Sequence, residues 1–132
     1  MRQVLRDQFD ALLEGVISAL PMGVAKLLEE VPVVVDDLPS PAVLRDLGMR
    51  EEEAIELCGL HTGAAFTERT VERPDLPSEI QLYREGIVDQ AGGWGGDDAD
   101  ERVREEIRIT LLHEIGHQFG LDEDDLQRLG YD

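Results

Sequence analysis

An apolar pattern of period four near the C-terminal end constrains the fold of this chain more than any other feature. The apolar residues at these steps are Val103, Ile107, Leu111 and Ile115. This spacing places their side chains along one face of an α-helix. Gly120 is suited to end the helix, because glycine adopts the left-handed conformation of a helix C-terminus without strain. The pattern predicts a helix over residues 101–119 that packs one face against the rest of the protein.

Shorter patterns along the rest of the chain predict a mixture of helices and strands. Helices are expected over residues 4–20, 22–30 and 123–129, and in short pieces around Gly48 between residues 42 and 56. Strands are expected over residues 31–35, 57–63 and 79–85. The first is β-branched almost throughout, which is typical of a strand buried on both faces, whereas the third alternates like a half-exposed strand before a turn at Gly86. These elements predict a single α+β domain over residues 1–132, with a small sheet packed against helices.

The charge of the chain excludes some classes of partner. Thirty acidic and twelve basic side chains give a net charge of -18. Such a charge repels nucleic-acid phosphates and anionic membrane surfaces, so neither is expected as a partner. It favours cations or basic peptides nearby, although a strongly charged surface more often serves solubility alone.

Location is predicted from cysteine content and from the absence of apolar runs. Cys58 is the only cysteine, so no internal disulfide points to an oxidising compartment. Charges are spaced through the first residues, unlike the apolar segment of a signal peptide. No apolar run approaches the ~20 residues needed to cross a bilayer. A cytoplasmic protein is the expectation, while the oligomeric state is left open.

The predicted helix over residues 101–119 carries the residues HEIGH at positions 113–117. His113 and His117 stand four apart, so their imidazoles rise from one face of the helix and can share one metal ion. Glu114 would lie beside that ion without binding it, where a carboxylate can take a proton from a bound water. The alternative is that all three are ordinary surface or core residues. The spacing favours a metal centre with two histidine ligands and Glu114 as general base.

A catalytic zinc ion takes three protein ligands, so a third donor is expected. Gly120 allows the chain to turn sharply after the helix, and the next side chain that could swing back toward the ion is Glu123. Asp122 and Asp124 flank it and are alternatives if the turn differs by one residue. These acids are also suited to capping the last predicted helix. The prediction is a Zn2+ ion held by His113, His117 and Glu123.

The segment HEIGHQFGLDE resembles the extended zincin signature HExxHxxGxx, which is followed by His or Asp. The chain as a whole resembles the small bacterial zincin-like metallopeptidase domain family. The resemblance extends over most of the chain: the first predicted helix, VPVVVDDLPSP, LCGLHTG, LPSEIQLYREGI and the last two predicted helices. It implies a minimal zincin-like α+β fold, with a small mixed sheet of three to four strands packed against helices that include the one bearing HExxH.

The resulting functional hypothesis is a zinc-dependent metallopeptidase that hydrolyses peptide bonds of a peptide or protein substrate through a metal-activated water. One alternative is a non-catalytic binding or adaptor protein with a structural metal, and another is a metal hydrolase acting on a non-peptide amide. Glu114 favours an enzyme, because a structural metal site has no need for a base. The strand over residues 80–84 is expected to pair with an extended substrate as an edge strand.

Several roles in this hypothesis have more than one candidate. The residues considered as donors to the oxyanion are Tyr131, Tyr83 and His61. Cys58 is either a third metal ligand, as in a peptide deformylase, or a small buried hydrophobe. Trp94 either walls the cleft or covers the core. A metzincin is excluded because no methionine follows the motif, and only fifteen residues remain after His117 for the downstream helix of a thermolysin-like enzyme.

Overall fold

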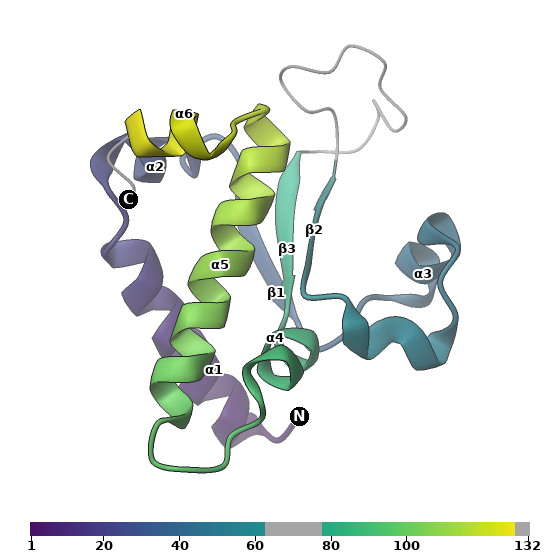
Figure 1. Ribbon diagram of the computed structural model, residues 1–132. Helices are drawn as coiled ribbons and strands as arrows, with labels where there is room; N and C mark the ends of the chain where they lie inside the picture. The colour runs from purple at the N-terminus through teal and green to yellow at the C-terminus, as the bar shows by residue number, and fades with distance from the viewer. Residues whose placement is uncertain (63–77, 129–132) are drawn as a thin grey trace.

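The computed structural model describes residues 1–62 and 78–128 of the chain. Its three strands are β1 (Val33–Asp36), β2 (Gly59–Thr62) and β3 (Glu79–Tyr83). They form one sheet in the order β1-β3-β2, in which β3 runs parallel to β1 and antiparallel to β2 (Figure 1). This mixed sheet with several helices confirms the expected α+β, zincin-like architecture.

Helices account for most of the other described residues. They are α1 (Gln3–Ser18), α2 (Met22–Leu27), α3 (Pro41–Leu47), the 3-10 helix η1 (Glu51–Glu56), α4 (Arg84–Ala91), α5 (Ala99–Phe119) and α6 (Glu123–Arg128). The long helix predicted from the period-four pattern is confirmed as α5, and Gly120 ends it in the left-handed conformation at φ 64°. Gly48 ends α3 in the same way. In Figure 1, α1 and α5 pack side by side over the sheet.

The core lies between the sheet and these two long helices. From β3, Ile80 and Leu82 point into it and are fully buried. The apolar stripe of α5 meets them there, with Val103, Ile107, Leu111 and Ile115 all fully buried, and α1 contributes Phe9. Burial of this kind stabilises a fold by roughly 25 cal/mol per Å² of apolar surface removed from water. The position of α5 against the sheet is therefore fixed by its apolar face, and the opposite residues of the helix are left for other roles.

The prediction that the first strand is buried on both faces is wrong. β1 forms one edge of the sheet, and its side chains alternate between half-buried and exposed. Val33 and Val35 pack against the core cluster, whereas Val34 is 37% exposed. A β-branched run suits any pleated surface, so its composition did not distinguish an edge strand from a central one.

The prediction that residues 80–84 form a substrate-pairing edge strand is also wrong. β3 lies between β1 and β2, and its backbone pairs on both sides. The prediction of a turn at Gly86 is wrong as well, because this residue is buried within α4. A Cβ atom there would lie 2.2 Å from the carbonyl oxygen of Leu57. Gly86 thus serves close packing of α4 against the segment after η1.

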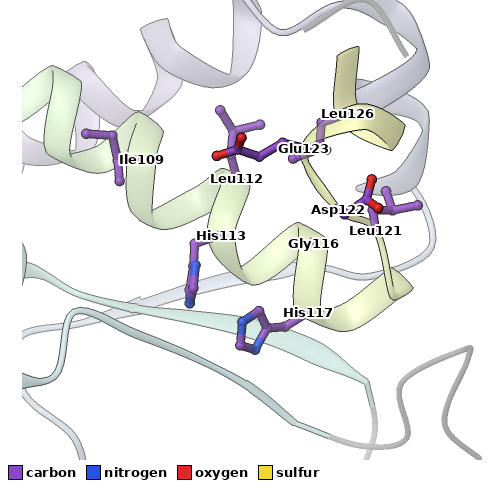
Figure 2. A pocket seen from close by; sticks show the side chains of 9 residues that line it. All are labelled: Ile109, Leu112, His113, Gly116, His117, Leu121, Asp122, Glu123 and Leu126. Carbon is purple, nitrogen blue, oxygen red and sulfur yellow. The ribbon is translucent and has the colours of Figure 1, made fainter. Parts of the chain in front are cut away.

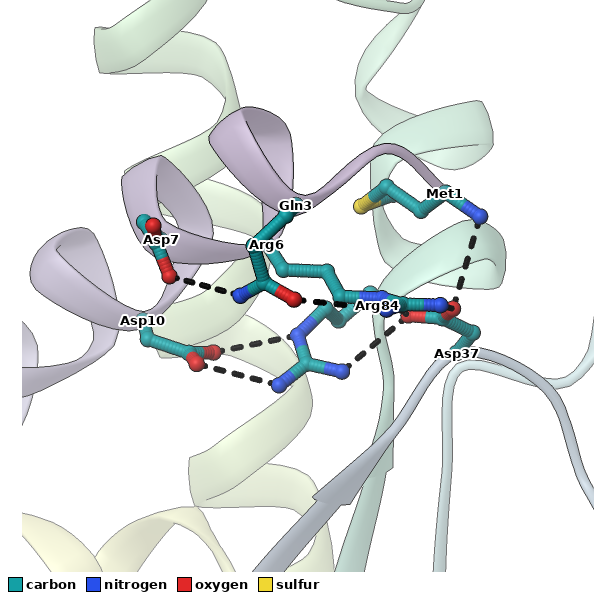
Figure 3. Close-up of polar contacts among 7 residues, drawn as sticks. All are labelled: Met1, Gln3, Arg6, Asp7, Asp10, Asp37 and Arg84. Carbon is teal, nitrogen blue, oxygen red and sulfur yellow. Dashed lines mark hydrogen bonds and ion pairs between the residues drawn. The ribbon is translucent and has the colours of Figure 1, made fainter.

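Four charged side chains tie α1, the end of β1 and the start of α4 together. We call Arg6, Asp10, Asp37 and Arg84 the arginine–aspartate clamp. Arg84 donates two hydrogen bonds of 3.0 Å to the Asp10 carboxylate and a third of 3.0 Å to Asp37 (Figure 3). Arg6 donates to the same Asp37 carboxylate at 2.6 Å. The hydrogen bond from Arg6, with further help from Arg84, lowers the pKa of Asp37 to about 2.

Candidate metal centre

The histidines of the motif stand on the face of α5 that the core does not use. His113 and His117 are both exposed, and their ring centroids lie 4.2 Å apart. Figure 2 shows both rings projecting from the same side of the helix. The i, i+4 spacing thus brings the two imidazoles together, as the sequence predicted. Two neutral imidazoles this close, open to solvent, can bind one cation such as zinc.

Glu114 lies between the two histidines in sequence but points into the protein. It is only 7% exposed, and its Oε1 atom lies 3.1 Å from Nδ1 of His61 on β2. An ionised carboxylate can only accept hydrogen bonds, so the imidazole Nδ1–H is the donor when Glu114 is charged. The ring of His61 also meets that of His117 edge-on, with centroids 5.3 Å apart. His61 is therefore part of the site.

Strand β2 reaches the helix because Gly59 has no side chain. Gly59 and His61 are two residues apart, so they share the face of the sheet that α5 covers. A Cβ atom at Gly59 would lie 2.9 Å from Cγ2 of Thr110 and 3.1 Å from Cγ of Glu114. These distances are shorter than ordinary van der Waals contact, so the close approach of β2 to α5 requires glycine at this position.

The acidic residues after α5 do not lie beside the imidazole rings. Asp122 accepts a hydrogen bond of 2.8 Å from the backbone N–H of Asp125, whose carboxylate accepts one of 3.0 Å from Asp122 in return. This reciprocal pair caps α6, which confirms the capping role predicted for Asp122. The Glu123 carboxylate lies on the other side of α5 from the imidazole rings (Figure 2). The structure therefore does not bring Glu123 together with the two histidines.

A groove runs between α5 and α6 beside the histidines. The α5–α6 groove has a volume of about 500 Å³ and is lined by Ile109, Leu112, His113, Gly116, His117, Leu121, Asp122, Glu123 and Leu126 (Figure 2). Its walls are mainly apolar, with the imidazoles at one side and the two acids at the other. A groove of this size and lining can receive a side chain of a bound molecule next to the histidines.

The histidine pair supplies part of the ligand set of a catalytic zinc ion. Within residues 1–62 and 78–128, no group of three His, Cys, Asp or Glu side chains is arranged to hold a metal. The histidine pair supplies two nitrogen donors of the type zinc prefers, and their exposure leaves room for a water and a further ligand. The residues thus fit two of the three protein ligands of a catalytic zinc site.

The remaining candidates lie away from the imidazoles or outside the described residues. Tyr83 is 1% exposed, its hydroxyl donates to Gln81, and burial raises its pKa to about 12. Strand alternation places Tyr83 on the sheet face opposite to His61 and its partner Ile80. Cys58 is partly buried against the core, and this burial raises the pKa of its thiol. Trp94 packs against the same core, and Tyr131 lies outside the described residues.

A model of a known protein family matches most of the chain. The family model described as zincin-like metallopeptidase matches residues 28–131, a range that includes β1, β2, β3, α5 and α6. No curated protein matches the chain. In the part of the chain that the structure describes, no helix is both long and apolar enough to span a membrane.

Proposed function

The chain belongs to the family of zincin-like metallopeptidases, and from this premise we propose that it hydrolyses peptide bonds with Glu114 as general base. His113 and His117 would hold the zinc ion. The observation that carries this proposal is the geometry of α5, where two exposed imidazoles 4.2 Å apart flank a buried carboxylate. A purely structural metal site has no use for such a carboxylate, which favours a hydrolytic one.

Each of the three motif residues has a distinct task in this proposal. Zinc bound at such a site supplies a water whose pKa is lowered to roughly 7. The imidazoles hold the ion at the helix surface, and Glu114 accepts the proton of the attacking water at its carboxylate. The same carboxyl group then gives the proton to the leaving amine. Glu114 is suited to this transfer because it is a buried residue of α5 that lies next to His113 in the helix.

The third ligand in this proposal is Glu123, whose carboxylate would have to move across from the other side of α5 when the ion binds (Figure 2). Asp122 already accepts the backbone N–H of Asp125 as a helix cap, which occupies one of its carboxylate oxygens. The Glu123 side chain makes no hydrogen bond or ion pair with any other residue among those the structure describes. Its place in the motif, three residues after Gly120, supports the assignment. Asp124 is the alternative if the turn is arranged differently when the ion is bound.

We propose a peptide or protein segment with an apolar residue next to the scissile bond as the substrate. The apolar wall of the α5–α6 groove, formed by Ile109, Leu112, Leu121 and Leu126, lies beside the histidines. Asp122 and Glu123 at its other side, together with the net charge of -18, favour basic residues elsewhere in the substrate. Among the described strands, β2 is the edge strand that contacts α5, and in this proposal its backbone pairs with an extended chain.

A library of short peptides tests this proposal. The zinc-loaded protein should cleave a subset of the library, and a chelator should stop the cleavage. Glu114→Gln should bind zinc normally and lose roughly 10²- to 10⁴-fold in kcat, the range expected for a general base. The matched control is Glu101→Gln, an exposed residue near the start of the same helix, which should behave like the wild type.

The same experiment separates the alternatives. Bound zinc with no cleavage of any peptide would favour a non-catalytic binding protein. Cleavage of simple amides without cleavage of peptides would favour a hydrolase of non-peptide amides. Undiminished cleavage by the Glu114→Gln variant would eliminate Glu114 as the base.

A further inference from the structure

We propose that His61 is a positioning residue that holds the Glu114 carboxylate in place for proton transfer. This inference rests on the proposed function, because it assigns His61 a role in the same reaction. It starts from the hydrogen bond of 3.1 Å between Nδ1 of His61 and Oε1 of Glu114, two residues separated by 53 positions in the chain.

The hydrogen bond engages one oxygen of the carboxylate and leaves the other available. No other hydrogen bond to Glu114 is formed by the residues that the structure describes. The Glu114 side chain is 9% exposed, whereas that of His61 is 27% exposed, so the pair lies at the boundary between core and solvent. Held by His61 at Oε1, the carboxylate cannot rotate freely about its terminal torsion, which is otherwise broad. Oε2 is then directed consistently toward the water that it must deprotonate.

Strand β2 is a rigid support for this task. His61 pairs with Ile80 of β3, whose side chain is fully buried. Gly59, two residues earlier on the same face, lets the strand approach Glu114 and Thr110 more closely than any other residue would allow. A side chain on a paired strand is positioned more precisely than one on a loop. Strand β2 therefore fixes the position of the imidazole ring relative to α5.

Two contacts of the His61 side chain bear on its role. Its ring contacts that of His117 edge-on at a centroid distance of 5.3 Å, and its Nδ1 atom is directed at Glu114. The three histidines do not form a ready metal-binding group with one another in the described residues. The geometry therefore points to a role through Glu114 and not through direct ligation, and the two roles give different results in the tests below.

Substitutions at His61 separate these roles in the zinc-loaded protein. His61→Leu should lower kcat roughly 10- to 100-fold with KM and zinc content unchanged, the loss expected for a hydrogen bond to a charged group. His61→Asn should restore most of the activity, because its amide nitrogen falls near the position of Nδ1. His61→Gln should not, since its amide falls near Nε2. Glu101→Gln, at an exposed position near the start of α5, is the control and should match the wild type.

The outcome that overturns the proposal is equally specific. Equal activity in the Asn and Gln variants, or no loss in the Leu variant, would exclude a positioning role. So would a Leu variant that loses zinc, or one whose Co2+-substituted form has a changed absorption spectrum, because either result would make His61 a metal ligand.

A measurement on the metal-free protein tests the hydrogen bond without relying on activity. Nitrogen NMR should show His61 in the tautomer protonated at Nδ1, and the Glu114→Ala variant should shift it toward the tautomer protonated at Nε2. A wild-type ring protonated at Nε2 alone would overturn the proposal. If this bond is found but no peptide is cleaved, the proposed peptidase activity fails while the pairing of His61 with Glu114 stands.

Discussion

The arginine–aspartate clamp and the candidate metal centre are two polar clusters that differ in whether their side chains already have partners of opposite charge. In the arginine–aspartate clamp, every charged group has a partner of opposite sign, and Arg84 at 13% exposure bridges Asp10 and Asp37. At the candidate metal centre, His113 and His117 stand exposed next to each other, and no acid of residues 1–62 and 78–128 forms an ion pair with either ring (Figure 2). The clamp is closed by its own side chains, while the centre leaves donor atoms for an added cation.

This difference indicates that the arginine–aspartate clamp stabilises the fold, whereas the histidine pair is available for binding a metal ion. Both use residues distant in sequence, but the clamp links three backbone elements and needs nothing more for its stability. The histidine pair contributes little to the core, and its close placement has a purpose only when an ion binds. Changes in the clamp should therefore alter stability with zinc binding intact, and changes at the centre should do the reverse.

The largest effect is expected at the histidines. His113→Ala should reduce bound zinc from about one ion per chain to nearly none, because the loss of one of three protein ligands strongly lowers the affinity of a catalytic site for zinc. Metal analysis after dialysis measures this directly. The matched control is Asp10→Ala in the clamp, which should keep its zinc. If the His113→Ala variant contained as much zinc as the wild type, the proposal that the histidine pair binds metal and the clamp does not would be contradicted.

The third ligand gives the next largest effect. Glu123→Gln should weaken zinc affinity by at least ~10-fold, since an amide oxygen is a poorer ligand than a carboxylate. Asp122→Asn is its control, because asparagine can still cap α6 and the hydrogen-bonded turn should persist. Competition with a metal-binding dye measures both affinities. If Asp124→Asn weakens binding while Glu123→Gln does not, the ligand is Asp124.

A substitution at the contact between β2 and α5 sharpens the comparison further. Gly59→Ala should destabilise the protein by about 1–3 kcal/mol and lower the rate of hydrolysis, because its Cβ atom would meet Thr110 at 2.9 Å and push His61 away from Glu114. Gly95→Ala is the control, since nothing lies within 4 Å of a Cβ atom there. Chemical denaturation and peptide turnover give the two readouts. A stable variant with full activity would contradict the packing described for β2.

The smallest effect is expected in the clamp, and it depends on pH. The pKa of Asp37 is lowered from 3.8 to about 2 in the folded protein, so the folded state binds this proton less readily than the unfolded chain. Its contribution, about 1 kcal/mol after allowance for solvent, is complete above pH 4 and is lost as the pH falls toward 2. Asp37→Asn should lower the free energy of unfolding at pH 7 and make it less dependent on pH in this window. An unchanged pH dependence would show that the clamp is not formed.

The sequence predicted α5 and its histidines well because both depend on local periodicity. The step of four in the apolar residues and the spacing of His113 and His117 are properties of one helix, and Gly120 marks its end. The cap at Asp122 is similarly local. Such features need no knowledge of how distant segments meet.

The order of the strands and the role of His61 depend on contacts between distant segments. Nothing in the run VPVVV distinguishes an edge from a central strand, and the alternation of β3 is compatible with either position. The glycine at position 86 is required by the close contact of α4 with Leu57, which no local pattern reveals. The glycine two residues before His61 was the only local signal that β2 approaches another element closely.

The central claim is that His113 and His117 share one zinc ion. Crystals of the zinc-loaded protein, measured on both sides of the zinc absorption edge, locate that ion by anomalous scattering. The account predicts one strong peak within about 2.0–2.1 Å of a ring nitrogen of each histidine. A peak at another place on the molecule, or none between these rings at saturating zinc, would contradict it.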